Sequence, residues 1–283
     1  MTMKRYTIIL FGLIFFSFVG RQTDKDKEQF VDIRGKKQFY LSKGAGEPVV
    51  VFITGLGPTM DDFQNVQNKI SKTTWTICYD RAGIGNSESF NNERTLENIA
   101  SELKEMVDAI GLDKPFLLVG HSRGGVIARY FVSKYPEKVS GLVLIDPALP
   151  EHRWLRKQLR TEREKIDFDN YYNSFCTDST KYSATIRNEF QNTFSTDSAL
   201  VSGKGFPVNI PITLIASNKI TKDKYSSEDV KIKTELIKAY LKLNPKIKLI
   251  FTDKAGHFIH DDQPNLVVNE ILSMTKILKG NVK

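Results

Sequence analysis

The sequence predicts an α/β fold, a mostly parallel sheet with helices on both faces and an inserted, mainly helical segment. Apolar strand patterns alternate with helical patterns along most of the chain. These strands are too uniformly apolar for a sheet with one face in water. The glycine-rich and polar segments that could carry chemistry each follow a predicted strand directly. Because the carboxyl ends of parallel strands share one edge of a sheet, we expect the functional residues at that edge.

The start of the chain stands apart from this pattern. Lys4 and Arg5 precede the uncharged apolar run Tyr6–Val19, and residues 21–29 form a polar spacer. A basic stretch followed by an apolar run too short to span a bilayer comfortably is typical of a secretory signal. An uncleaved N-terminal anchor is the alternative, because Phe18-Val19-Gly20 is a poor cleavage site. We expect residues 1–20 to lie outside the fold, and an exported protein, periplasmic or secreted, or one anchored to the membrane through this segment.

The first half of the predicted core contains regular strand and helix signals. Thr95 is suited to cap a helix, and Gly111 is the residue expected just beyond its end. The loop after the third predicted strand is Thr54-Gly55-Leu56-Gly57-Pro58. The elements expected before residue 112 are hairpin strands at 30–33 and 38–41, a buried strand at 49–53, a helix at 61–70, a strand at 75–79 and a helix at 96–110.

One serine in the middle of the chain has the surroundings of a nucleophile. The apolar run Phe116–Val119 leads into Gly120-His121-Ser122-Arg123-Gly124, which fits the pattern G-x-S-x-G, and a helical pattern follows up to Pro136. Strand, sharp turn and helix are the context that this motif requires. The turn lifts the hydroxyl above the sheet edge, and the start of the helix offers free backbone N–H groups. The context favours Ser122 as a nucleophile over an ordinary loop serine.

The second half of the chain interrupts the sheet with a long insertion. A strand at 139–145 ends in Asp146-Pro147, and residues 148–209 then hold many aromatic side chains among charges but no apolar strand. Long segments of this kind are more often functional than passive. We therefore expect residues 148–209 to form a helical cap above Ser122, and residues 30–147 and 210–283 to form the core. The later core elements are a strand at 212–216, a helix at 227–243, a strand at 247–251 and a helix at 264–278.

A serine hydroxyl needs a base and an orienting carboxylate to become a nucleophile. Of the four histidines, His257 follows the last strand in a glycine-led loop that can swing over the sheet edge. His121 is directed elsewhere by the turn, His152 lies in the inserted segment, and His260 is better suited to capping the last helix. We therefore predict His257 as the base.

The orienting acid has two candidates. Asp146 stands at the end of a strand, on a rigid element at the correct edge, which favours it. Asp223 is the alternative acid, as the first carboxylate after the strand at 212–216. The oxyanion donors are expected to be the backbone N–H groups of Leu56 and Arg123.

The composition and charge of the chain limit which kinds of binding partner are expected. Forty per cent of the 283 residues are apolar, which suffices for a full core. The net charge of +8 is spread along the chain without a basic block interleaved with aromatic residues, so nucleic-acid binding is not expected. No Cys/His cluster has metal-ligand spacing, and the expected chemistry needs neither a metal nor a cofactor. The expected partner is a small acyl substrate, and the oligomeric state is not determined by the sequence.

Over roughly residues 30–280 the chain resembles the α/β-hydrolase superfamily. The matching motifs are the glycine loop at 54–58, Asp80-Arg81-Ala82-Gly83-Ile84-Gly85-Asn86-Ser87, Gly120-His121-Ser122-Arg123-Gly124-Gly125, Leu142-Val143-Leu144-Ile145-Asp146-Pro147 and Gly256-His257-Phe258-Ile259-His260. The resemblance implies the order serine, acid, histidine, with a cap between strands six and seven. The chain departs from the family by having Thr54 where a histidine is usual, and Ser217-Asn218-Lys219 where the acid is usual. Relatives that dehalogenate use an aspartate nucleophile, so Ser122 argues against that activity.

The resulting hypothesis is a serine hydrolase that cleaves a carboxylic ester or related acyl bond of a small molecule through an acyl-enzyme on Ser122. Two alternatives stay open. One is an acyltransferase with the same three residues, in which an alcohol or thiol replaces water. The other is a non-catalytic protein that keeps the fold and binds a ligand.

Overall fold

The computed structural model describes residues 27–159, 161–195, 200, 209–220, 227–244 and 246–280. The predicted signal or anchor at residues 1–20 and the alternative acid Asp223 lie outside these ranges. No helix within them is both long and apolar enough to cross a membrane.

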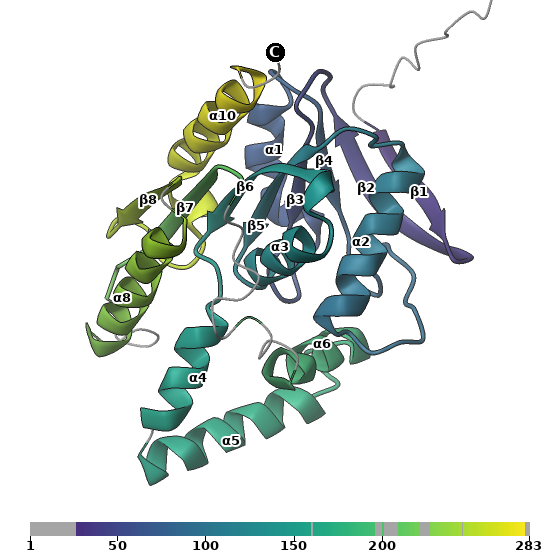
Figure 1. Ribbon diagram of the computed structural model, residues 1–283. Helices are drawn as coiled ribbons and strands as arrows, with labels where there is room; N and C mark the ends of the chain where they lie inside the picture. Colours follow the sequence, from purple (N-terminus) through teal and green to yellow (C-terminus); the bar gives the residue numbers. More distant parts are fainter. Residues whose placement is uncertain are drawn as a thin grey trace, which may run out of the picture.

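An eight-stranded sheet forms the centre of the molecule (Figure 1). The strand order is β1-β2-β4-β3-β5-β6-β7-β8, and β2 is antiparallel to both of its neighbours while all other pairs are parallel. The mostly parallel sheet of the predicted fold class is thereby confirmed. The strands are β1 Lys27–Ile33, β2 Lys36–Lys43, β3 Val50–Ile53, β4 Thr76–Tyr79, β5 Phe116–His121, β6 Val139–Ile145, β7 Ile212–Ser217 and β8 Ile247–Thr252.

Helices cover both faces of this sheet, as the apolar strands require. Successive strand residues point to opposite faces of the sheet. Leu118 of β5 therefore belongs to a hydrophobic cluster with residues of α2, α3 and α8, whereas Val119 belongs to a second cluster with residues of α1 and α10. These two groups of helices cover opposite faces (Figure 1). The described helices are α1 Gln64–Ile70, α2 Leu96–Ile110, α3 Arg123–Lys134, α4 Pro150–Leu159, α5 Glu162–Thr177, α6 Ala184–Ser195, α8 Ser227–Leu243, α9 Ile259–Asp262 and α10 Pro264–Gly280, with 3-10 turns η1 Met60–Phe63 and η2 Pro136–Lys138.

Helix α2 forms where the capping signals predict it. The Thr95 side chain accepts a hydrogen bond from the backbone N–H of Asn98 at 3.2 Å, and Gly111 ends the helix with a φ of 86°. This left-handed conformation is open to glycine without a Cβ penalty. Both predicted bounds of the helix are therefore confirmed.

Several element boundaries differ from the prediction, and β2, for example, covers Lys36–Lys43 rather than 38–41. Strand β1 begins at Lys27, inside the predicted spacer 21–29, because the backbone of this edge strand pairs with β2 up to Ser42 whatever its side chains are. The predicted helix at 61–70 is divided into η1 and α1.

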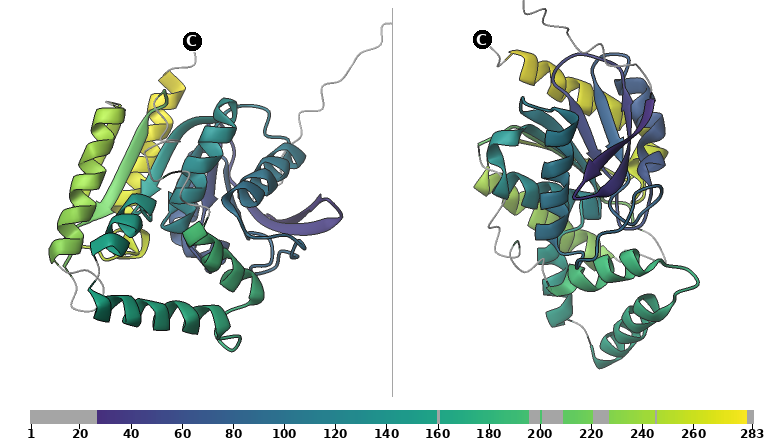
Figure 2. Two further views of the ribbon diagram at one scale, coloured as in Figure 1. Left: turned by 60° about the horizontal axis from the view of Figure 1, so that its bottom comes forward. Right: turned by 90° about the vertical axis from the view of Figure 1, so that its right-hand side faces the viewer.

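Of the chain between β6 and β7, the described residues form the helices α4, α5 and α6, which gather at one end of the molecule (Figures 1 and 2). Helix α6 lies against loops that follow β3 and β4. A Cβ placed on Gly57 would lie 3.7 Å from Ile186, and one placed on Gly83 would lie 2.2 Å from the Thr185 hydroxyl. The inserted helices thus contact the edge of the sheet at which its parallel strands end.

Candidate active site

Ser122 lies in the turn between β5 and α3, with a φ of 50° and a ψ of −117°. A non-glycine residue at positive φ is strained, and the surroundings must enforce it. The close packing depends on two glycines, because a Cβ on Gly120 would lie 2.5 Å from the carbonyl O of Gly124, and one on Gly124 would lie 2.2 Å from that of Ile53. The strand, turn and helix around Ser122 are those that the G-x-S-x-G context predicts.

The structure brings Ser122, His257 and Asp146 together from three separate segments. The Nε2 atom of His257 lies 2.9 Å from the Oγ atom of Ser122, and its Nδ1 atom lies 2.7 Å from Oδ2 of Asp146. A carboxylate only accepts, so Nδ1 carries the proton and Nε2 is left to accept the hydroxyl proton of Ser122. This is the geometry of a serine next to a general base.

Asp146 is held at the end of β6 by both backbone and side-chain contacts. Its N–H donates to the carbonyl of Ile215 at 2.7 Å, and its Oδ1 accepts from the N–H of Ser217 at 2.9 Å and from Nζ of Lys233 at 2.5 Å. Burial raises the pKa of the Asp146 carboxyl, but the hydrogen bond from His257 and the charge of Lys233 outweigh it and hold that pKa below its usual value. The carboxylate therefore stays ionised beside His257.

Lys233 was not a candidate in the sequence. It comes from α8, and its side chain is 9% exposed. Its Nζ also donates to the carbonyl of Ser217 at 3.0 Å, so it joins the ends of β6 and β7. The alternative orienting acid is predicted in this region, after the seventh strand. Asp223, that alternative, lies outside the part of the chain that the structure describes.

The loop of His257 is fixed on both sides of the imidazole ring. The N–H of Gly256 donates to Oδ2 of Asp262 in α9 at 2.8 Å. The carbonyl of His257 lies 3.0 Å from Nε2 of His121. His121 does point away from the nucleophile as predicted, but His260 is a buried residue of α9 rather than a cap of α10. His152 lies in α4, where its Nε2 atom is 3.9 Å from Oδ1 of Asp229.

The glycine loop lies directly against the nucleophile. A Cβ on Gly55 would lie 3.5 Å from the Cβ atom of Ser122. The backbone N–H of Leu56 belongs to this loop, and that of Arg123 begins α3. That these two N–H groups bind an oxyanion stays a prediction.

Arg81 fixes the glycine loop through its carbonyl groups. Nη1 of Arg81 donates to the carbonyl of Thr54 at 2.8 Å, and Nη2 donates to that of Gly55 at 2.7 Å. Nη2 also lies 3.1 Å from Oε1 of Glu189, which α6 contributes and which is fully buried. Nothing in the sequence marks Glu189, which is 108 positions away, as the partner of Arg81.

Comparison with known proteins identifies the class of fold. A family model described as the alpha/beta hydrolase fold matches residues 48–198. The Bacillus subtilis protein YbdG is 28% identical over 144 residues, which cover 50% of this chain and 44% of that protein. The chain thus spans less than half the length of that relative. An AB hydrolase superfamily protein of Gibberella zeae is 23% identical and covers 82% of this chain and 88% of its own length.

Solved structures of similar fold have diverged far in sequence. The epoxide hydrolase VrEH1 from Vigna radiata superposes with a TM-score of 0.68 and is 17% identical, over 89% of this chain and 98% of that chain. At this identity the likeness concerns the fold alone.

Proposed function

Since the chain belongs to the alpha/beta hydrolase fold family, we propose that it is a serine hydrolase that cleaves a carboxylic ester or related acyl bond of a small molecule. The observation that carries the proposal is the pair of hydrogen bonds at 2.7 and 2.9 Å that join Asp146 to His257 and His257 to Ser122. Three such groups in this order turn a weakly nucleophilic hydroxyl into an activated one.

In the first step, Ser122 Oγ attacks the acyl carbon while Nε2 of His257 takes its proton. The ionised Asp146 stabilises the resulting imidazolium, and the N–H groups of Leu56 and Arg123 stabilise the negative charge on the carbonyl oxygen. The bond to the leaving group then breaks, and His257 returns the proton to it. In the second step, water attacks the acyl-enzyme with His257 again as base, releasing the acid and restoring Ser122.

We also propose that residues 148–209 cap this site. The contacts of α6 with the glycine loop, through Ile186 near Gly57, support a position above the carboxyl edge of the sheet. Export, or anchoring through residues 1–20, is likewise a proposal, supported by the basic and apolar pattern of that segment.

The test is hydrolysis of p-nitrophenyl esters of increasing acyl length by the wild type and by Ser122→Ala, with the intact mass measured after rapid quenching. We expect hydrolysis and a transient acyl adduct on Ser122 in the wild type, and neither in the variant. The matched control is Ser133→Ala, which removes the hydroxyl of another serine on the same segment that contacts only the carbonyl of Tyr130 among the hydrogen bonds described. Equal turnover by wild type and Ser122→Ala would contradict the proposal. Adding an alcohol and measuring ester product separates hydrolysis from acyl transfer.

A further inference from the structure

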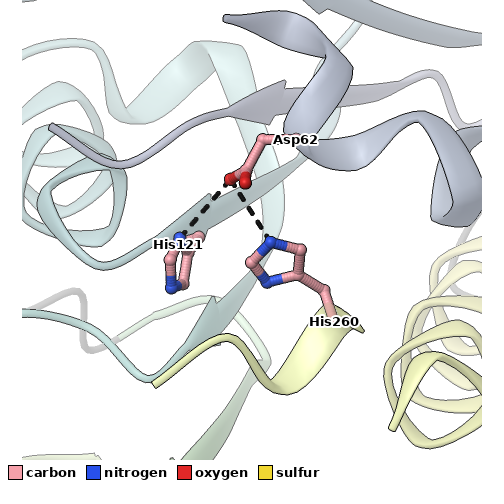
Figure 3. Close-up of side chains that lie close together, drawn as sticks. All are labelled: Asp62, His121 and His260. Atoms are coloured by element: carbon pink, nitrogen blue, oxygen red, sulfur yellow. Dashed lines mark ion pairs between the residues drawn. The ribbon is translucent and has the colours of Figure 1, made fainter. Parts of the chain in front are cut away.

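Three titratable side chains, those of Asp62, His121 and His260, lie close together (Figure 3). Asp62 comes from η1, His121 from the end of β5 and His260 from α9. Oδ2 of Asp62 lies 3.6 Å from Nδ1 of His121 and 3.3 Å from Nε2 of His260. Both imidazole side chains are at most 1% exposed, and that of Asp62 is 11% exposed. The proposed mechanism uses none of these three side chains.

The cluster connects the segments that carry the catalytic groups. His121 directly precedes Ser122, His260 lies in the turn that follows His257, and Asp62 follows the glycine loop. The rings of His121 and His257 have centroids 4.8 Å apart, and those of His121 and His260 are 4.4 Å apart. A displacement of any one of the three side chains would therefore be transmitted to the surroundings of His257.

The direct connection is the hydrogen bond between His121 and the backbone of His257. A carbonyl oxygen only accepts, so Nε2 of His121, 3.0 Å from it, carries the proton. Burial lowers the pKa of His121 in spite of the nearby Asp62, which favours the neutral ring with this single proton. Nδ1 then faces the carboxylate without a proton, and Nε2–H of His260 is the donor available to Asp62.

A buried carboxylate in this place needs compensation. Burial raises the pKa of Asp62, but the interactions with the two neighbouring imidazoles outweigh it and hold that pKa below its usual value. With Nδ1 of His121 unprotonated, the group that can donate to this carboxylate is Nε2–H of His260, 3.3 Å away. The carboxylate thus fixes the orientation of His260, whose ring packs edge-on against that of His121.

We propose that Asp62, His121 and His260 form a positioning cluster that holds the carbonyl of His257, and with it the catalytic ring, opposite Ser122. The inference rests on the proposed function, in which His257 is the base. The cluster does not touch the substrate. It acts through the His257 loop, so its loss should lower kcat while leaving KM little changed.

The experiment uses the full chain with His121→Leu, His121→Asn and His121→Gln. The Asn side chain is too short to reach the carbonyl of His257, whereas the Gln amide can place its nitrogen near the position of Nε2. The matched control is Gln67→Leu, which also removes a buried donor to a backbone carbonyl, but to that of Leu41 in β2, at 3.1 Å, rather than to one in the His257 loop. Two readouts are taken: kcat and KM for p-nitrophenyl acetate, and the proton resonance of the His257 Nδ1–H bonded to Asp146, identified by its absence in His257→Gln.

We expect His121→Leu and His121→Asn to lose this resonance and about 100-fold in kcat, the effect of displacing a catalytic group by roughly 1 Å. His121→Gln and Gln67→Leu should keep both. If the wild type shows the resonance and His121→Asn loses it, yet no ester is turned over, the positioning role stands while the proposed function fails.

Three results would overturn the inference. They are an unchanged resonance and kcat in His121→Asn, an equal loss in Gln67→Leu, or one zinc ion retained per purified chain with kcat lost on its removal. The last result would assign the three side chains, whose ligand atoms lie within 4.8 Å of one another, to a metal site instead.

Discussion

The two carboxylate oxygens of Asp146 have different partners, and each partner has its own consequence. Oδ2 accepts from Nδ1 of His257, which orients the ring, while Oδ1 accepts from Lys233 and from the N–H of Ser217. The first contact supports the base in the proposed reaction. The second keeps the carboxylate ionised and fixed on β6.

We predict that Asp146→Asn lowers kcat by about 10⁴-fold, since an amide can present its NH2 group to His257 and stabilise the wrong tautomer. Asp223→Asn should change kcat little. The measurement is steady-state hydrolysis of p-nitrophenyl acetate by both variants. The reverse order of effects would move the acid from Asp146 to the segment after β7.

Lys233→Met should shift the acid limb of the kcat/KM profile toward higher pH, by about one pH unit. The lysine charge helps to hold the pKa of the Asp146 carboxyl down, so without it this carboxyl takes up a proton at higher pH, and its support of His257 is lost earlier as the solution is acidified. The profile of Lys238→Met, an exposed lysine of the same helix, should stay at its wild-type position. If the acid limb of the kcat/KM profile of Lys233→Met stays at its wild-type pH, the charge of Lys233 does not affect the site.

The sequence suffices for residues that follow a strand and carry a motif, such as Ser122 and His257. It does not reveal Lys233, which is 87 positions from Asp146. A lysine in a charged helical segment is expected at the surface. Lys233 lies next to the Asp146 carboxylate only because α8 packs beside β7. Asp62 and Glu189 are missed for the same reason, since their partners are distant in sequence.

Helix α6 contacts the glycine loop at 54–58 and so connects the inserted helices to the candidate site. Glu189 of α6 pairs with Arg81, which in turn holds the carbonyls of Thr54 and Gly55. A guanidinium can bind both carbonyls and the carboxylate at once, whereas an ammonium lacks the planar fork.

Arg81→Lys should therefore lower kcat by up to about 100-fold, because a displaced loop misplaces the Leu56 N–H that we propose as an oxyanion donor. Arg34→Lys, which alters an exposed arginine paired with Glu105, serves as the control and should leave kcat unchanged. Ester hydrolysis and thermal unfolding are measured on both, so that a loss of fold is recognised. A wild-type kcat in Arg81→Lys would show that the position of this loop does not affect the reaction.

The regular elements of the core could be predicted because their signals are local. The cap and stop of α2 and the apolar runs of β3 and β5 lie within the segments themselves. Helix α9 could not, because Ile259–Asp262 is too short to show a helical period. The division of the predicted helix at 61–70 into η1 and α1 likewise cannot be predicted from the spacing of its apolar residues.

For the molecule as a whole, burial of charged groups next to the sheet edge couples the fold to pH. The pKa values of Asp62 and Asp146 are lowered on folding, so both contribute stability above the ordinary aspartate value of about 3.9 and lose it as the pH falls through their folded values. Burial raises the pKa of Asp80, whose contribution has the opposite sign and is lost as the pH rises.

We expect the free energy of unfolding to fall less in Asp146→Asn than in the wild type between about pH 6 and about pH 3.5, because the variant lacks one of the carboxyl groups whose pKa folding lowers. Urea unfolding at several pH values in that range gives this slope. A wild-type slope in the variant would mean that Asp146 has the same proton affinity in the folded and unfolded chains.

The central claim is that Ser122 is an activated nucleophile, and labelling with a fluorophosphonate tests it most directly. The account predicts rapid covalent labelling of the wild type at Ser122, none in Ser122→Ala, and labelling slowed by orders of magnitude in His257→Ala. A folded wild type that stays unlabelled, or that labels as fast without His257, would contradict it.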